Sequence, residues 1–219
     1  MPDRPEPTPP RLAQELVTEA VTLSDEAVWD GHVISGSFVG ESAGHVDVIG
    51  CRVTGAAFTG AEIDRLRLVD SVVEDCELSG LVLARSALTR VEFRRCRLSG
   101  LIASGAQLSD VRFSDCKIDD ANFRMTTWKR AALDGCVMTG SDFREAKLAT
   151  TRFDGCDLTR VDFTKASVPG VSLAGSTLDE IRGADSLRGV VITADQVVPL
   201  AVAVFSQMGI RVDDGSTDA

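Results

Sequence analysis

A hydrophobic residue stands at every fifth position from Val33 to Leu178, and this regularity limits how the chain can fold more than any other feature. All thirty positions of the series are hydrophobic, although hydrophobic residues make up only 44% of the chain, so chance does not explain the pattern. A period of five differs from the 3.6 of an α-helix and from the 2.0 of a flat strand. It fits a chain that turns a corner every five residues and points two side chains per side inward.

A second series of small side chains lies two positions before the first, and cysteine recurs in it every twenty residues. The cysteines are Cys76, Cys96, Cys116, Cys136 and Cys156. Many glycines, among them Gly80 and Gly140, share a third phase, in which a corner can require a positive φ. The three phases together indicate a core, a second inward row and a turn in each unit.

The motifs "DANFR", "GSDFR" and "RVDFT" resemble the units of pentapeptide-repeat proteins, which follow a loose A(D/N)LXX pattern. The resemblance covers residues 31–182. It implies an all-β solenoid, a right-handed quadrilateral β-helix in which four pentapeptides make one square coil of twenty residues. Successive coils would stack like strands of a parallel sheet, so residues twenty apart would lie in one column.

In such a stack the recurring cysteines form an inward column, and the geometry of this column argues against a disulfide or a zinc site. Parallel Cβ atoms about 4.8 Å apart exceed the ~3.8 Å that a disulfide prefers. Thiols in a line cannot enclose a tetrahedral zinc ion, and the sequence has no CxxC motif. We therefore expect buried cysteines that pack as small hydrophobic residues.

The segments before the repeats predict a disordered tail and a helix. Residues 1–10 contain five prolines, which indicates a disordered tail. In residues 11–30 the side chains of Leu12, Leu16 and Val21 fall on one helical stripe. We expect a short N-terminal capping helix over the first coil. A helix that binds a partner is the alternative.

The segment after the repeats, residues 183–212, predicts a helical dimerisation element. Thr193 and Gln196 fit a capping box, Gly209 is a plausible helix stop, and Pro199 must kink the helix or mark its start. No charged residue occurs from position 196 to 210, and a helix that is apolar all round must be covered on both sides. We expect a symmetric homodimer with the interface residues Val198, Leu200, Val204, Phe205 and Met208. The alternative is burial within the monomer's own cap, and residues 213–219 are expected to be a disordered tail.

Composition narrows the classes of function. The 33 acidic and 23 basic residues give a net charge of −10, which argues against direct binding to nucleic acid or to an anionic membrane. We expect a soluble, cytoplasmic protein, because no signal peptide or membrane-spanning stretch is evident. His32 and His45 are the only histidines and no catalytic motif occurs. The sequence therefore predicts no enzyme, no cofactor and no metal.

The C-terminal stretch "SLRGVVITADQVVPLAVAVFSQMGIRV" resembles the end of the quinolone-resistance pentapeptide proteins. The resemblance implies a dimeric rod that binds DNA gyrase, a type II topoisomerase, by imitating duplex DNA. Residues 31–180 carry 21 acidic and 18 basic residues, a net charge of only −3, whereas duplex DNA carries about one charge per 1.7 Å. The best acidic cluster contains Asp119, Asp120, Asp157, Asp179 and Glu180. Two hypotheses result, a rigid protein-interaction scaffold and, as the alternative, a DNA mimic that binds gyrase.

Overall fold

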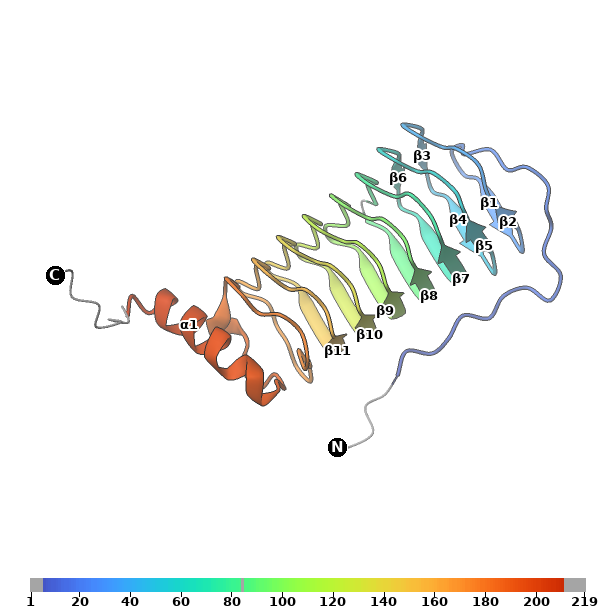
Figure 1. Ribbon diagram of the computed structural model, residues 1–219. Helices are drawn as coiled ribbons and strands as arrows, with labels where there is room; N and C mark the ends of the chain where they lie inside the picture. The colour runs from blue at the N-terminus through green and yellow to red at the C-terminus, as the bar shows by residue number, and fades with distance from the viewer. Residues whose placement is uncertain (1–5, 84, 211–219) are drawn as a thin grey trace.

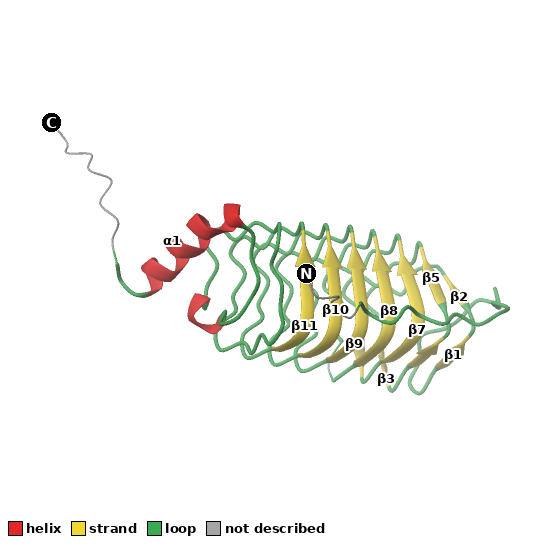
Figure 2. Cartoon of the chain, turned by 90° about the horizontal axis from the view of Figure 1, so that it is seen from below, coloured by secondary structure: helices red, strands yellow, loops and turns green. Residues whose placement is uncertain are grey.

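The chain forms a parallel β-solenoid that ends in one α-helix, as the computed structural model shows for residues 6–83 and 85–210 (Figure 1). The coils stack into a rod, with the helix at one end (Figure 2). The predicted fold class, an all-β solenoid with a C-terminal helix, is confirmed. None of the helices in this part of the chain is long and apolar enough to cross a membrane.

Short strands come first along the chain, and eight-residue strands follow. The strands are β1 (Val28–Asp30), β2 (Val33–Ile34), β3 (Ser42–Gly44), β4 (Asp47–Ile49), β5 (Arg52–Thr54), β6 (Glu62–Asp64), β7 (Arg67–Glu74), β8 (Ala87–Arg94), β9 (Gln107–Ser114), β10 (Thr127–Asp134) and β11 (Lys147–Asp154). The 3₁₀ turns η1 (Ala184–Ser186) and η2 (Ala194–Gln196) and the helix α1 (Val197–Gln207) complete the fold.

Successive coils pair in parallel at a spacing of twenty residues, as the cysteine interval predicts. Leu88 of β8 pairs with Leu108 of β9, and the same step links β9 to β10 and β10 to β11. Isolated bridges continue it to the pair of Asp162 and Arg182. The step shortens to nineteen at both ends, where Val28 pairs with Asp47 and Ser172 with Val191. Residues twenty apart therefore form columns along most of the rod.

The hydrophobic series fills the centre of the rod with one exception. Every position from Phe38 to Leu178 is buried, but Val33 is not among the core residues and its neighbour Ile34 is fully buried instead. The reason is the nineteen-residue step of the first coil, which pairs Ile34 with Val53. The prediction for Val33 was wrong by one residue.

Aromatic rings continue the columns through the core. Phe123 stacks on Phe143 with ring centroids 5.0 Å apart, and Phe143 stacks on Phe163 at 5.6 Å. Phe93 and Phe113 stack at 4.7 Å in another column. Stacks of this kind bury large apolar areas and add aromatic contacts. They confirm that like side chains stand above one another.

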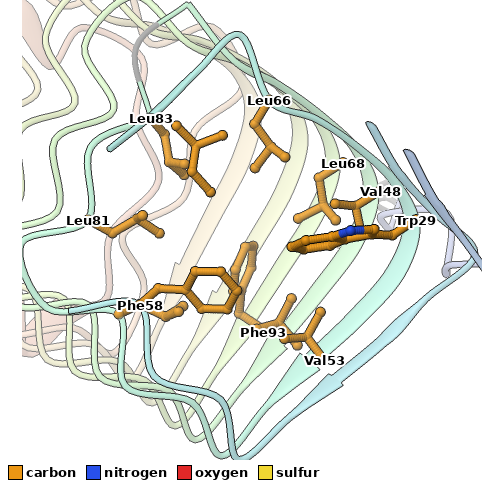
Figure 3. A pocket seen from close by; sticks show the side chains of 12 residues that line it. Trp29, Val48, Val53, Phe58, Leu66, Leu68, Leu81, Leu83 and Phe93 are labelled. Carbon is orange, nitrogen blue, oxygen red and sulfur yellow. The ribbon is translucent and has the colours of Figure 1, made fainter. Parts of the chain in front are cut away.

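The N-terminal half of the core contains a cavity of about 60 Å³ lined only by hydrophobic side chains, including Trp29, Phe58 and Phe93 (Figure 3). The side chains of one column explain the cavity. In the order Val53, Val73, Phe93, Phe113, Leu133 and Phe153, the first two coils carry valine where later coils carry larger side chains. The valines leave space that no neighbouring side chain fills.

The predicted N-terminal capping helix is wrong, because residues 11–30 contain no helix. An extended strap, residues 6–17, instead runs along the outside of the rod (Figure 1). The backbone N–H of Val17 donates to Gly31 and its carbonyl accepts from Val33, so the strap satisfies backbone groups of the first coil without a helix. The stack also begins before residue 31, since β1 pairs with β4.

The predicted tails differ in outcome. Residues 6–10 were expected to be disordered, yet Thr8 and Glu6 bond to the rod, so for them the prediction was wrong. Residues 1–5 and 213–219 lie outside the described residues.

The C-terminal helix follows the expected signals. Thr193 and Gln196 form the capping box, although the turn they cap is η2 and α1 begins only at Val197. Pro199 lies in the first turn of α1, where a backbone N–H has no partner within the helix, so proline is tolerated there. Gly209 follows the helix with φ +72°, which suits a helix stop.

Candidate interaction surfaces

The helix α1 presents a hydrophobic strip to solvent. Val198 is 70% exposed, Val202 56% and Phe205 40%, and they follow one another at helical spacing. On the other face Ala203 is buried, and Leu200 and Val204 pack against the core. One helix face therefore covers the rod, and the opposite face has no cover among residues 6–83 and 85–210.

The predicted interface residues divide between these two faces. Val198, Phe205 and Met208 are exposed, whereas Leu200 and Val204 contact the protein's own core. Val202 was not among the predicted interface residues, yet it is exposed at the centre of the strip. Its position four residues after Val198 was the available signal.

Two glutamines fasten α1 to the last coils, a role that the sequence did not predict for either of them. The Nε2 of Gln196 donates to the carbonyl oxygens of Leu173 at 2.6 Å and Ser176 at 2.5 Å. The Oε1 of Gln207 accepts from the backbone N–H of Ala184 at 2.9 Å. These bonds satisfy backbone groups at the open edge of the stack. Polar residues inside an otherwise apolar segment were the signal for this role.

A surface hollow of about 750 Å³ lies beside α1, between the helix and the last coil. Asp179, Glu180 and Arg160 line it from the rod, and Val198 and Val202 line it from the helix. Two residues of the predicted acidic cluster therefore adjoin the exposed hydrophobic strip.

The predicted acidic cluster lies on one side of the rod in its C-terminal half. Asp119 and Asp179 lie in one column, because they are sixty residues, or three coils, apart. Asp120 and Glu180 lie in the neighbouring column for the same reason. Asp157 accepts bonds from the hydroxyls of Thr159 and Thr139, and the bond from Thr159 lowers the pKa of Asp157. We define the five residues Asp119, Asp120, Asp157, Asp179 and Glu180 as the acidic face.

This face differs from the N-terminal half of the rod in how its charges are neutralised. In the N-terminal half, arginines pair with acids about one coil earlier: Arg67 with Asp47, Arg85 with Asp64, Arg90 with Asp70 and Arg95 with Asp75, each at 2.6–2.8 Å. Within residues 6–83 and 85–210, Asp120, Asp157, Asp179 and Glu180 form no ion pair, and Asp119 only a long one of 3.8 Å with Lys117. Four of the five carboxylates therefore have no ion pair in the described part of the chain, and Arg160 is a cation that lines the hollow beside Asp179 and Glu180.

The cysteine column is buried and hydrogen-bonded within the rod. All six cysteines are free and buried. The Sγ of Cys76 donates to Glu74 O at 3.2 Å, and that of Cys96 to Arg94 O at 3.3 Å. A hydrogen bond with the Cys96 thiol, together with burial, raises the pKa of Cys76. No group of histidine, cysteine and acidic side chains that could hold a metal occurs in the part of the chain that the structure describes.

The family model "Pentapeptide repeat region" matches residues 46–123 and 106–182. The comparison with curated proteins gives no match. The fold is similar to that of HetL, a pentapeptide repeat protein involved in heterocyst differentiation regulation from the cyanobacterium Nostoc sp. strain PCC 7120. That match is 15% identical and covers 77% of this chain and 90% of HetL, with a TM-score of 0.44.

Two further solved structures are similar to this chain in fold. The full-length plasmid-mediated fluoroquinolone resistance protein QnrB1 is 19% identical, and the match covers 88% of this chain and 100% of QnrB1 with a TM-score of 0.32. A pentapeptide repeat protein from the thylakoid lumen of Arabidopsis thaliana is 24% identical over 46% of this chain and 78% of that protein, with a TM-score of 0.36.

Proposed function

Because the chain belongs to the pentapeptide-repeat family, we propose that it is a non-catalytic, rigid scaffold that binds other proteins and assembles as a homodimer through α1. The continuous core supports rigidity, since each coil is bonded to the next along its backbone. Large side chains such as Trp128, Phe143 and Phe153 are fully buried there. Outward side chains therefore keep fixed spacings, which suits a surface that another protein recognises.

The exposed strip on α1 is the observation that carries the homodimer. Val198, Val202 and Phe205 lie on a helix whose other face is already used against the rod. A contiguous apolar face of this kind on a soluble protein marks an interaction site. A second copy offers the same strip, and a two-fold axis would let the two strips cover each other.

The experiment that tests this proposal is a mass measurement by multi-angle light scattering. The full chain should have about twice its monomer mass of 23.3 kDa, and Val202→Glu should have the monomer mass. The matched control is Val39→Glu, because Val39 is 55% exposed and Val202 56%. That control should remain a dimer. A monomeric wild-type chain, or a dimeric Val202→Glu variant, would refute the interface.

A second candidate function is the DNA mimic that binds DNA gyrase. The specific observation in its favour is that four acids of the acidic face form no ion pair among the described residues, and that this face adjoins α1. In the proposed dimer, the two acidic faces would flank the two-fold axis. Their unneutralised carboxylates would offer charge to a surface that normally binds duplex DNA.

A gyrase supercoiling assay tests this candidate. The chain should inhibit supercoiling at a micromolar concentration of the dimer. The double variant Asp119→Lys with Asp120→Lys should be an at least tenfold weaker inhibitor. Glu41→Lys with Glu62→Lys is the control, since both acids are exposed at the other end of the rod. Absence of inhibition by the wild-type chain would remove gyrase as the partner. Equal loss in both double variants would show that net charge, and not the acidic face, is responsible.

A further inference from the structure

The strap, residues 6–17, lies along one corner of the rod and is held mainly through its backbone. Its N–H groups donate from Ala13 to Gly50 O at 3.1 Å, from Arg11 to Asp70 Oδ1 at 3.1 Å and from Thr8 to Asp110 Oδ1 at 3.0 Å. The acceptors belong to one corner column, in which the residues twenty apart are Gly50, Asp70, Arg90, Asp110 and Arg130. The strap therefore crosses successive coils.

The positions of proline in the strap match the charges of this column. The side chain of Arg90, which stands between Asp70 and Asp110, donates hydrogen bonds and offers no acceptor. Between Arg11 and Thr8 the strap carries Pro9 and Pro10, which have no N–H to satisfy. Three residues of polyproline II span about 9.3 Å, and two coils rise about 9.6 Å. The strap thus places a donor at each aspartate and none at the arginine.

One charged side chain anchors the end of the strap. The carboxylate of Glu6 pairs with Arg112 at 2.5 Å and also with Arg152. These arginines lie two coils apart, and the residue between them in the column is the fully buried Ala132. The small side chain of Ala132 leaves room between the guanidinium groups. Both arginines also pair with Asp134, at 2.6 and 2.9 Å. The Nε of Arg152 is buried without a hydrogen-bond partner among the described residues and lies 3.9 Å from Asp154 Oδ2.

This corner of the rod contacts the strap's backbone more than its side chains. A Cβ added to Gly31 would stand 3.0 Å from the Ala13 Cβ, and one on Gly50 would stand 3.3 Å from the Ala13 nitrogen. These glycines let the strap approach closely. The side chains of Thr8, Pro9 and Arg11 are mostly exposed, so they contribute little to the contact.

We propose that this corner of the rod is a binding site for an extended, proline-rich peptide with one acidic residue, and that residues 6–17 occupy it as a resident ligand that a partner's peptide can displace. The peptide needs N–H donors spaced as Thr8, Arg11 and Ala13 are, a proline pair between the first two, and a carboxylate two residues before the first. The site is separate from the acidic face and from α1, so its test does not depend on the proposed dimer.

Fluorescence anisotropy with a labelled peptide of residues 5–17 tests the proposal. The receptor is the full chain with a weakened strap, Glu6→Lys with Thr8→Pro and Ala13→Pro, which changes no residue of the rod. This receptor should bind the peptide at least tenfold more tightly than the wild-type chain, whose own strap competes at a high effective concentration. The same peptide carrying Glu6→Lys should bind at least tenfold more weakly.

Rod variants locate the site. In the weakened-strap chain, Arg112→Gln with Arg152→Gln should lower peptide affinity at least tenfold. Arg85→Gln with Arg95→Gln, which removes two exposed arginines that the strap does not contact, should leave the affinity unchanged. Equal binding to the wild-type and weakened-strap chains, no binding to either, or indifference to the Arg112 and Arg152 changes would overturn the proposal.

Hydrogen exchange supplies a second readout. Excess unlabelled peptide added to the wild-type chain should speed amide exchange in residues 6–17 and leave the core strands β8 to β10 protected. In the weakened-strap chain the same residues should exchange rapidly without peptide. Persistent protection of Arg11 and Leu12, which keep their amide hydrogens in that variant, would refute the donor pattern on which the proposal rests.

Discussion

Replacing Val73 by leucine should stabilise the protein, because Val73 borders the cavity in the N-terminal half of the core. In its column, Val53 and Val73 precede Phe93 and Phe113, which fill the corresponding space in later coils. Val73 is itself buried. A longer side chain at this position can therefore extend into empty space without displacing a neighbour.

The size of the effect follows from the cavity. One additional buried methylene is worth about 0.8 kcal/mol. The cavity holds about 60 Å³, and at ~24 cal/mol per Å³ its complete removal would contribute about 1.4 kcal/mol as a ceiling. We expect Val73→Leu to raise the free energy of unfolding by about 1 kcal/mol, which corresponds to a Tm increase of roughly 2–4 °C for a chain of this length.

The matched control is Val111→Leu, the same exchange in a filled part of the core. Val111 is fully buried and does not border the cavity, so the extra methylene should cost about 1–3 kcal/mol through overpacking. Urea unfolding followed by circular dichroism measures both variants against the wild-type chain. The two midpoints should shift in opposite directions. A Val73→Leu variant that is destabilised as much as Val111→Leu would refute the account of the cavity.

Three further changes have defined outcomes. Gly183→Ala should lower the free energy of unfolding by several kcal/mol in thermal unfolding, because φ is +72° and the new Cβ would stand 2.2 Å from a backbone nitrogen. Gly155→Ala should lower it by only about 1 kcal/mol, because no atom of the described residues lies within 4 Å of the new Cβ. The hydrogen bond from Arg130 lowers the pKa of Asp110 to about 2, below an unfolded value of about 3.9. The resulting stabilisation, on the order of 2 kcal/mol, is present above about pH 4 and is lost as the pH falls towards 2. The Tm of Asp110→Asn should therefore decline less over this pH range than the Tm of the wild-type chain. The six buried thiols should not react with Ellman's reagent until the chain unfolds, and rapid reaction of the native protein would contradict the buried column.

The repeat could be predicted from the sequence because each side chain's direction depends on one local count. A five-residue period places Leu108 and Phe113 inward whatever their neighbours are, and a twenty-residue period stacks Cys96 on Cys116. The count fails where a coil loses a residue. Val33 was predicted inward, but the nineteen-residue step at the first coil turns Ile34 inward instead.

The strap could not be predicted, because its partners exist only after the coils stack. Leu12 and Leu16 follow helical spacing, but the acceptors Asp70 and Asp110 lie 59 and 102 residues away from their donors in the chain. Bonds to these acceptors replaced those of a helix.

The interface residues of α1 show a similar limit. An apolar helix needs cover on both sides, yet the sequence does not say which side faces the rod. Leu200 and Val204 turned out to face it. The acidic face could be grouped by column arithmetic, whereas the neutralisation of Asp70 and Asp75 by arginines one coil away became visible only in the structure.

Small-angle X-ray scattering of the full chain tests the central claim, a rigid rod doubled through its C-terminal end, more directly than any other measurement. The wild-type maximum dimension should be about twice that of the Val202→Glu variant, and the radius of gyration of the cross-section should be the same for both. A wild-type particle as short as the variant, or one of equal length and doubled cross-section, would contradict an end-to-end dimer.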